Sequence, residues 1–189
     1  MKKNFVLTLL TILMLSIHVS AQVHTIGEKF GGGIIFYVDS TGTHGLIAST
    51  ADQIAEVKWY NGVYRYTDGL VDGIGGGAKN TTIILAIQTP DNPKGIFAAK
   101  VCADYSVSVD GVTYHDWYLP TIAELDLLQL QKIVVGGFTD YYGGLYWSSN
   151  ESDQSRALAR FISGQSTVTD RRRGYDKSIT HRVRAIRAF

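Results

Sequence analysis

The sequence predicts an α+β fold in which short strands at both ends of the chain enclose two or three short helices. β-branched and aromatic residues cluster in short runs near the start, at 34–38 and 44–49, and near the end, at 157–162 and 181–189. The helical patterns lie between them and do not alternate with strands, as they would in a doubly wound parallel sheet. We therefore expect the terminal strands to meet in one twisted antiparallel sheet, with long loops between the elements.

Residues 1–21 have the composition of a secretory signal peptide. Lys2 and Lys3 form a positive start, an apolar run covers 5–17, and small residues precede position 22. The apolar run is too short and too often interrupted by polar residues for a membrane span. We expect cleavage before Gln22 and a periplasmic, cell-surface or secreted protein without a membrane span. An uncleaved N-terminal anchor is the alternative.

The remainder, 22–189, is expected to form one domain, because it is long enough for its own core and contains no linker or repeat. Its single cysteine, Cys102, lies among small apolar residues, which favours a buried thiol over a reactive one. The whole chain has 18 basic and 17 acidic residues and so lacks the net positive charge typical of nucleic-acid-binding proteins. Within 22–189, residues 153–189 carry nine basic and three acidic residues, whereas the part before them carries seven basic and fourteen acidic ones.

The first third of the chain predicts strands followed by a long loop. The run 34–38 leads into turn chemistry at 39–43 and a returning strand at 44–49, which together indicate a hairpin. A further short strand is expected at 57–60. The glycine-rich segment 69–77 lacks the Gly-Lys-Ser/Thr ending of a phosphate-binding loop, so an irregular loop is expected there.

Three segments in the middle predict helices from their capping residues. Asn80 is expected to cap a helix over 81–88, and Asn92 a second helix that runs to about Tyr105. The third helix, over 121–132, has the strongest signal, since Thr121 and Glu124 have the spacing of a capping box.

The last third predicts strands again. Residues 145–148 are expected to form a strand that leads into a polar loop over 149–153. The segments 157–162 and 166–171 flank Ser163-Gly164 as a hairpin. The end of the chain, 181–189, alternates apolar residues with arginines and predicts a strand with a basic face.

Four motifs in the second half of the chain, taken together, resemble one known family. They are WYLPTIAEL at 117–125, YWSSNE at 146–151, ALARF with its following glycine at 157–164, and HRVRAIR at 181–187. In order and spacing they resemble the C-terminal domain family of bacterial collagen-like adhesins, the Lcl C-terminal domain. The resemblance covers most of 31–189.

This resemblance implies a C-type-lectin-like fold, related to formylglycine-generating-enzyme-like folds, with a twisted antiparallel sheet, long loops and adjacent termini. It also implies a secreted or surface module that acts in adhesion through carbohydrate or protein binding. No collagen-like Gly-X-Y tract precedes the domain in this sequence. The resemblance therefore does not carry over the trimerising stalk of those adhesins.

No catalytic constellation is evident. The formylglycine-generating relatives bind copper with a pair of cysteines, whereas this chain has Cys102 alone, and Glu124 is explained by its capping box. We expect no catalytic residue, no cofactor and no metal, with a calcium site in the polar loop over 150–153 as the alternative to a solvated loop. The histidines of the exported chain lack metal-ligand spacing and are expected in sheets or at the surface: His24, His44, His115 and His181.

Tyrosines and arginines supply the candidate binding residues. Tyrosines in polar, glycine-containing segments are expected at the surface, where they can stack on sugars or anchor a protein, while Trp117 and Trp147 are expected in the core. The arginines at 171–173, with Lys177 and the basic terminal strand, suggest a patch for sulfated or carboxylated polysaccharide; a solvated hairpin end is the alternative. The candidate residues are Arg171, Arg172, Arg173, Arg182, Arg184, Tyr141, Tyr142, Tyr64 and Tyr66.

These observations favour a non-enzymatic module that binds a glycan, for example an acidic polysaccharide, or an extracellular protein. A structural or assembly component of the cell envelope that binds a protein partner is one alternative. An enzyme without recognisable motifs is another. The sequence indicates neither the ligand nor the oligomeric state.

Overall fold

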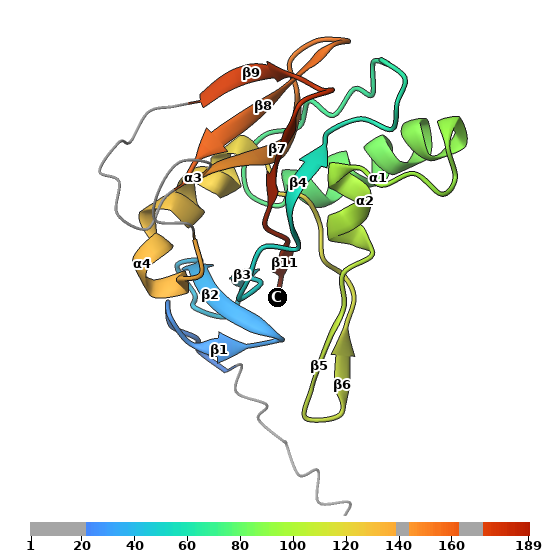
Figure 1. Ribbon diagram of the computed structural model, residues 1–189. Helices are drawn as coiled ribbons and strands as arrows, with labels where there is room; N and C mark the ends of the chain where they lie inside the picture. The colour runs from blue at the N-terminus through green and yellow to red at the C-terminus, as the bar shows by residue number, and fades with distance from the viewer. Residues whose placement is uncertain (1–21, 139–143, 163–171) are drawn as a thin grey trace, which may run out of the picture.

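Two curled sheets dominate the computed structural model, which describes residues 22–138, 144–162 and 172–189 (Figure 1). The first sheet is antiparallel, in the order β1-β2-β3-β11, and comprises β1 (Lys29–Phe30), β2 (Gly33–Val38), β3 (Gly45–Ala48) and β11 (Ile186–Ala188). The second, in the order β4-β10-β7-β8-β9, comprises β4 (Ile54–Lys58), β10 (Thr180–Val183), β7 (Leu145–Glu151), β8 (Arg156–Phe161) and β9 (Arg172–Asp176). Its β10–β7 pair is parallel and its other pairs are antiparallel.

The remaining elements are helices and a separate two-stranded hairpin. The helices are α1 (Gly76–Gln88), the 3₁₀ turn η1 (Thr89–Asp91), α2 (Ala98–Ala103), α3 (Ile122–Leu130) and α4 (Lys132–Val135). The hairpin consists of β5 (Val107–Val109) and β6 (Val112–Tyr114). This arrangement confirms the predicted α+β class. None of the helices in the described parts of the chain combines the length and the apolar character that crossing a bilayer requires.

The first and last strands of the described residues share the first sheet, as the sequence predicts, but the other strands form a second sheet instead of joining the same one. β11 pairs with β3, and β3 forms the predicted hairpin with β2. The His24 ring also contacts the ring of the last residue, Phe189, at a centroid distance of 5.0 Å. The terminal strand predicted over 181–189 is nevertheless two strands, because the chain leaves the second sheet after Val183 and enters the first at Ile186.

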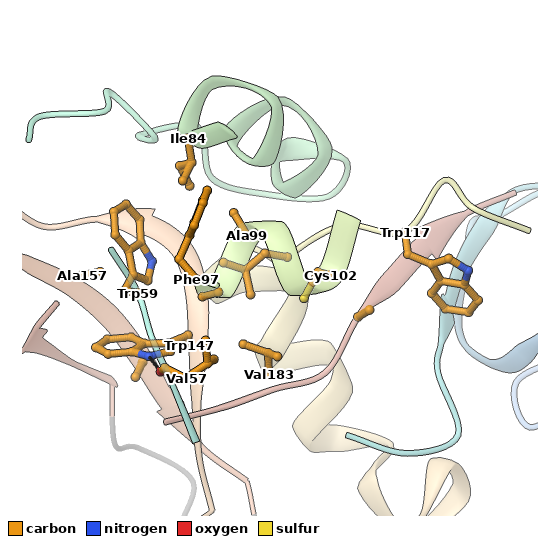
Figure 2. Packing of buried hydrophobic residues seen from close by; sticks show 14 of the residues in the cluster. Val57, Trp59, Ile84, Phe97, Ala99, Cys102, Trp117, Trp147, Ala157 and Val183 are labelled. Carbon is orange, nitrogen blue, oxygen red and sulfur yellow. Dashed lines mark hydrogen bonds between the residues drawn. The ribbon is translucent and has the colours of Figure 1, made fainter. Parts of the chain in front are cut away.

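β7 is the centre of the second sheet, and both of its faces are buried. Tyr146 faces a cluster that includes α3 and the first sheet, while Trp147 faces a cluster that includes α1 and α2. Figure 2 shows Trp147 beside Val57, whose carbonyl accepts a 2.9 Å hydrogen bond from the indole Nε1. Trp117 and Cys102 lie in the same cluster, which confirms the predictions of a buried tryptophan and a buried thiol.

The polar loop expected over 149–153 is in part a strand. Ser149, Asn150 and Glu151 continue β7 and are buried, because other parts of the protein replace water as their hydrogen-bond partners. Asn150 Oδ1, for example, accepts from the amide of Ile122 at 2.7 Å. Polar composition alone had suggested a loop, and the burial of these groups explains why that prediction was wrong.

Two helix starts also differ from the predictions. α1 begins at Gly76 rather than after Asn80, because the Asn80 side chain points into the structure and bonds both backbone groups of Val71. A Cβ atom at Gly77 would lie 2.5 Å from Glu124 Oε2, so glycine is needed for α1 to approach α3 this closely. The second predicted helix is shorter, since the carbonyl of Asn92 accepts from Asn61 and α2 starts only at Ala98.

The third helix starts as predicted. The Thr121 hydroxyl accepts from the Glu124 amide at 3.1 Å, and the Glu124 carboxylate accepts from the Thr121 amide at 2.7 Å. The same carboxylate accepts from the amide of Gly75, which precedes α1, at 2.8 Å. Glu124 therefore caps the N-termini of two helices.

The chain crosses between the two sheets twice, and one buried ion pair joins the crossings. The first crossing links β3 to β4 and contains Asp52, and the second links β10 to β11 and contains Arg184. Arg184 Nη2 lies 2.7 Å from Asp52 Oδ1, and the arginine also donates to the carbonyls of Ser49 and Gly137. We call Asp52 and Arg184 the crossing pair.

Candidate functional site

The segment between β4 and α1 carries the exposed tyrosines, and we call its residues 60–66 the tyrosine loop. Trp59, just before it, is buried and donates from Nε1 to the carbonyl of Ser148 at 2.8 Å. The rings of Tyr60 and Tyr64 stack at a centroid distance of 4.8 Å. The loop therefore leaves the core from a fixed point and packs partly on itself.

A buried ion pair lies directly beneath this loop. Lys177 is fully buried and pairs with Glu151 at the end of β7. Its ammonium also donates to the carbonyls of Arg65 and Gln154, at 2.9 and 3.0 Å. Burial lowers the pKa of Lys177, and the neighbouring Glu151 carboxylate opposes that shift.

Glu151 extends the same network to the next part of the loop. Its carboxylate accepts from the amide of Thr67 at 2.9 Å and from the amide of Asp68 at 3.0 Å. The pair of Lys177 and Glu151 thus ties together the tyrosine loop, the β7–β8 turn and the β9–β10 turn. We call this network the loop staple.

The Tyr64 hydroxyl is anchored as well. It donates to Asp176 Oδ1 at 2.6 Å, and that hydrogen bond raises the pKa of Tyr64. The amide and hydroxyl of Ser178 donate to the same carboxylate oxygen, at 2.8 and 2.6 Å. Asp176 is therefore held in place while it positions the tyrosine ring.

The surface of the loop is partly aromatic and partly polar. Tyr64 and Tyr66 are 38% and 62% exposed, which agrees with the predicted exposure of both residues. The Arg65 guanidinium lies between them in sequence and donates to both carboxylate oxygens of Asp91. Gln154, also exposed, reaches the carbonyl of Tyr64 from the β7–β8 turn.

The predicted arginine patch is not assembled by the described residues. Arg184 is fully buried in the crossing pair, Lys177 is fully buried in the loop staple, and Arg182 donates to Asp52 at 3.0 Å. These three side chains therefore form contacts within the protein. Arg173 is exposed on β9, which is separated from the β10 strand of Arg182 by β7 and β8.

Some predicted site residues lie outside the described residues. Arg171 falls in 163–171, as does the whole strand expected over 166–171, and Tyr141 and Tyr142 fall in 139–143. The backbone of Arg172 begins β9, but its side chain is not described.

Sequence reasoning missed the residues that organise the tyrosine loop. Asp91, the pair of Glu151 and Gln154, and Asp176 belong to three segments that are distant in sequence, so no local spacing indicates that they converge. The tyrosines themselves gave a signal, because Tyr64 and Tyr66 stand in a polar segment without apolar periodicity.

Two shallow hollows lie elsewhere on the molecule. One has a volume of about 510 Å³ and lies between the residues 29–33 and the β5–β6 hairpin. The other has a volume of about 490 Å³ and is lined by Ile96, Val101 and Tyr105 together with residues 51–54.

The carboxylates inside the protein are hydrogen-bonded to other parts of the structure and do not line an open site. Asp52, Glu124 and Glu151 each accept hydrogen bonds from two or more donors. Burial strongly raises the pKa of the Cys102 thiol, which disfavours a reactive thiolate. Across the described parts of the chain, no group of three or more His, Cys, Asp or Glu residues is placed to hold a metal ion.

The loop staple and the exposed tyrosines are thus the best-defined candidate site. The chain matches no protein-family model and no curated protein, so an assignment of function rests on this geometry.

Proposed function

We propose that this protein is a secreted or cell-surface binding module that binds an extracellular glycan through the tyrosine loop. The observation that supports this best is the exposure of Tyr64 and Tyr66 above the buried loop staple. Tyrosine offers an apolar face for a sugar ring and a polar tip for its hydroxyls, and it loses little conformational entropy on binding. Because the loop is already held in position, binding does not have to order it.

Polar groups around the loop supply the hydrogen-bonding partners that a sugar needs. The Arg65 side chain is 48% exposed and carries donors beyond those used by Asp91, and the Gln154 amide lies beside the loop. The arginine patch contributes less to this proposal than the sequence suggested, since Arg184 and Lys177 are buried. A neutral or weakly charged glycan therefore suits the described surface better than an acidic polysaccharide.

We infer that the fold is C-type-lectin-like and that the chain is related to the Lcl C-terminal domain. The pairing of β11 with β3, the contact of His24 with Phe189 and the long irregular segment before α1 support this inference. We also infer that the protein is not an enzyme. The structural use of its buried carboxylates and of Lys177 supports that view.

A glycan array with the full-length protein, purified after export, tests the glycan proposal. We expect binding that withstands moderate salt and EDTA. Tyr66→Ala, which removes the ring, should weaken binding roughly tenfold, whereas the matched variant Tyr66→Phe keeps the ring and should bind nearly as the wild type does.

Other outcomes of the array point to other ligands. Binding that fades with salt and is insensitive to Tyr66→Ala would instead support the arginines, and loss with EDTA would support a calcium site. A blank array would contradict the glycan proposal for the sugars tested. It would favour a protein partner at the same tyrosines, as expected for a structural or assembly component of the envelope.

A further inference from the structure

The β5–β6 hairpin projects from the body of the protein as an arm (Figure 1). Its strands pair with each other and, within the described part of the chain, with no third strand. Asp110 and Gly111 form its tip with φ angles of 50° and 79°, as the tight turn of a two-residue hairpin requires. We call residues 107–114 the arm.

The arm has one apolar face and one polar face. In its register Val107 lies opposite Tyr114 and Val109 opposite Val112, so these four side chains share a face. Ser108 and Thr113 form the other face, where their hydroxyl oxygens are 2.8 Å apart.

The base of the arm is firmly attached, whereas its tip is open. Trp117 Nε1 donates to the carbonyl of Tyr114 at 3.1 Å, and the Arg187 guanidinium lies 4.7 Å from the Tyr114 ring centroid. Near the tip, Val109 and Val112 are 42% and 52% exposed. The apolar face is thus presented to solvent on a rigid support.

A groove runs along this apolar face. The hollow of about 510 Å³ has the arm as one wall and residues 29–33 as the other. Phe30 and the glycines 31–33 make that second wall largely apolar as well.

The arm carries none of the lysine, proline or bulge that can protect an exposed strand from pairing with another chain, although its two strands are short, with 3 residues each. A two-stranded hairpin is also marginally stable without a covering layer. The apolar face of the arm is therefore suited to contact with another protein surface.

The charges at the groove indicate what covers it. Asp110 lies at the tip of the arm and Lys29 on the opposite wall, and neither forms an ion pair with another described residue. In a two-fold dimer the same surface meets itself. Asp110 of one copy can then face Lys29 of the other, twice per dimer.

We propose that the arm and its groove form the interface of a two-fold dimer of this protein. Each copy lays the apolar face of its arm against the other, with Val109 and Val112 at the centre and the two Asp110–Lys29 pairs at the rim. This surface is separate from the tyrosine loop, so dimerisation does not depend on the proposed glycan binding. Two tyrosine loops in one dimer would nevertheless let a polymeric glycan bind at two points.

Sedimentation equilibrium of the full-length exported protein, from about 1 to about 100 µM, tests the dimer. We expect wild type to dimerise and Val112→Lys to raise the dissociation constant at least about tenfold, because it places a charge in the apolar centre. Thr113→Lys is the matched control, since the neighbouring residue lies on the opposite face of the same strand. It should dimerise as wild type does, and circular dichroism should show that both variants are folded.

Charge variants test the orientation of the two copies. Lys29→Glu and Asp110→Asn should each weaken the dimer and reduce its dependence on salt, and asparagine tolerates the backbone conformation at position 110. A monomeric wild type at the highest concentration would overturn the proposal and leave the groove to a foreign polypeptide. Equal effects of Val112→Lys and Thr113→Lys would also overturn it, because only one of them faces the groove.

Discussion

His181 is a half-buried histidine whose ring Nε2 is itself buried and has no hydrogen-bond partner among the described residues. It lies in β10 between Trp147 and Tyr175, with ring-centroid distances of 4.3 and 4.9 Å. This apolar environment disfavours the imidazolium and lowers the pKa of His181 from 6.5 to about 4. The folded protein therefore favours the neutral ring, and protonation opposes folding.

Stability should consequently fall in mild acid. The unfolded chain takes up the His181 proton near pH 6.5 but the folded protein only near pH 4, so the contribution is complete above pH 6.5 and is lost as pH falls to 4. The full loss amounts to about 3 kcal/mol in the free energy of unfolding. Urea denaturation at pH 7 and pH 4.5 measures most of this loss.

Two variants separate His181 from the other acid-sensitive groups. His181→Phe keeps an apolar ring without a titrating group, so the variant should lose less stability than wild type between the two pH values. His44→Gln changes an exposed histidine and should behave as wild type does. Parallel pH profiles for wild type and His181→Phe would show that this ring does not control acid stability.

At the scale of single elements, α3 has the most completely specified start. Thr121 Oγ1 accepts from the Glu124 amide and donates to the carbonyl of Gly73 at 3.1 Å, while Glu124 also caps α1 through Gly75. One short motif therefore fixes the directions of two helices. Burial raises the pKa of Glu124, although its amide donors and the Tyr118 hydroxyl favour the ionised form.

Removal of the cap should be measurable. Thr121→Ala should lower the free energy of unfolding by about 1–2 kcal/mol, because it leaves the Glu124 amide and the Gly73 carbonyl without this partner. Thr121→Ser keeps the hydroxyl and should cost less than about 1 kcal/mol, the value of one methyl group. Thr82→Ala, at an exposed position in α1, should be nearly neutral. Equal losses for Thr121→Ala and Thr121→Ser would mean that packing, not capping, dominates at this position.

The helices and strands also show which signals in the sequence are sufficient to predict secondary structure. The capping box and the β2–β3 hairpin are local, and both were predicted because their residues specify the structure without help from the rest of the chain. α1 was predicted to start too late, since the side chain of Asn80 bonds Val71 and Ser149 instead of capping a helix. The strand character of Ser149–Glu151 depends on similar distant partners.

In the candidate site, too, features that depend on local sequence were predictable and features that depend on distant partners were not. Exposure of Tyr64 and Tyr66 was predictable from their polar surroundings. The burial of Arg184 was not predictable. Its partner Asp52 lies more than a hundred residues earlier in the chain, and an alternating strand pattern does not reveal such a partner. The groove beside the arm was likewise unpredictable, since its two walls are far apart in sequence.

At the scale of the whole molecule, the crossing pair connects the two sheets. Asp52 accepts from Arg184 at 2.8 Å, from Arg182 at 3.0 Å and from the Tyr146 hydroxyl at 3.0 Å. The Phe138 ring covers the Arg184 guanidinium, whose Cζ lies 4.2 Å from the ring centroid. Both sheets therefore depend on one carboxylate that compensates a fully buried charge.

Asp52→Asn should destabilise both sheets together. Loss of the carboxylate leaves Arg184 buried without a counter-charge, which costs roughly 3–5 kcal/mol in the free energy of unfolding. Tryptophan fluorescence and far-ultraviolet circular dichroism should shift to the same lower urea midpoint, because the two cores share β7. Asp104→Asn, which breaks the exposed pair with Lys100, is the matched control and should change stability by less than about 1 kcal/mol. Separate midpoints for the two probes would show that the sheets unfold independently.

The place of β10 and β11 has a consequence for the order of folding. β10 lies between β4 and β7, and β11 pairs with β3, so residues 180–188 complete both sheets. Pairing across such sequence separations slows folding, because each contact must first close a long loop. Until β10 and β11 are in place, β4 and β7 lack the strand that lies between them and β3 lacks one of its partners. The residues before Thr180 therefore cannot complete either sheet by themselves, and the crossing pair closes in the same late step of folding as both sheets.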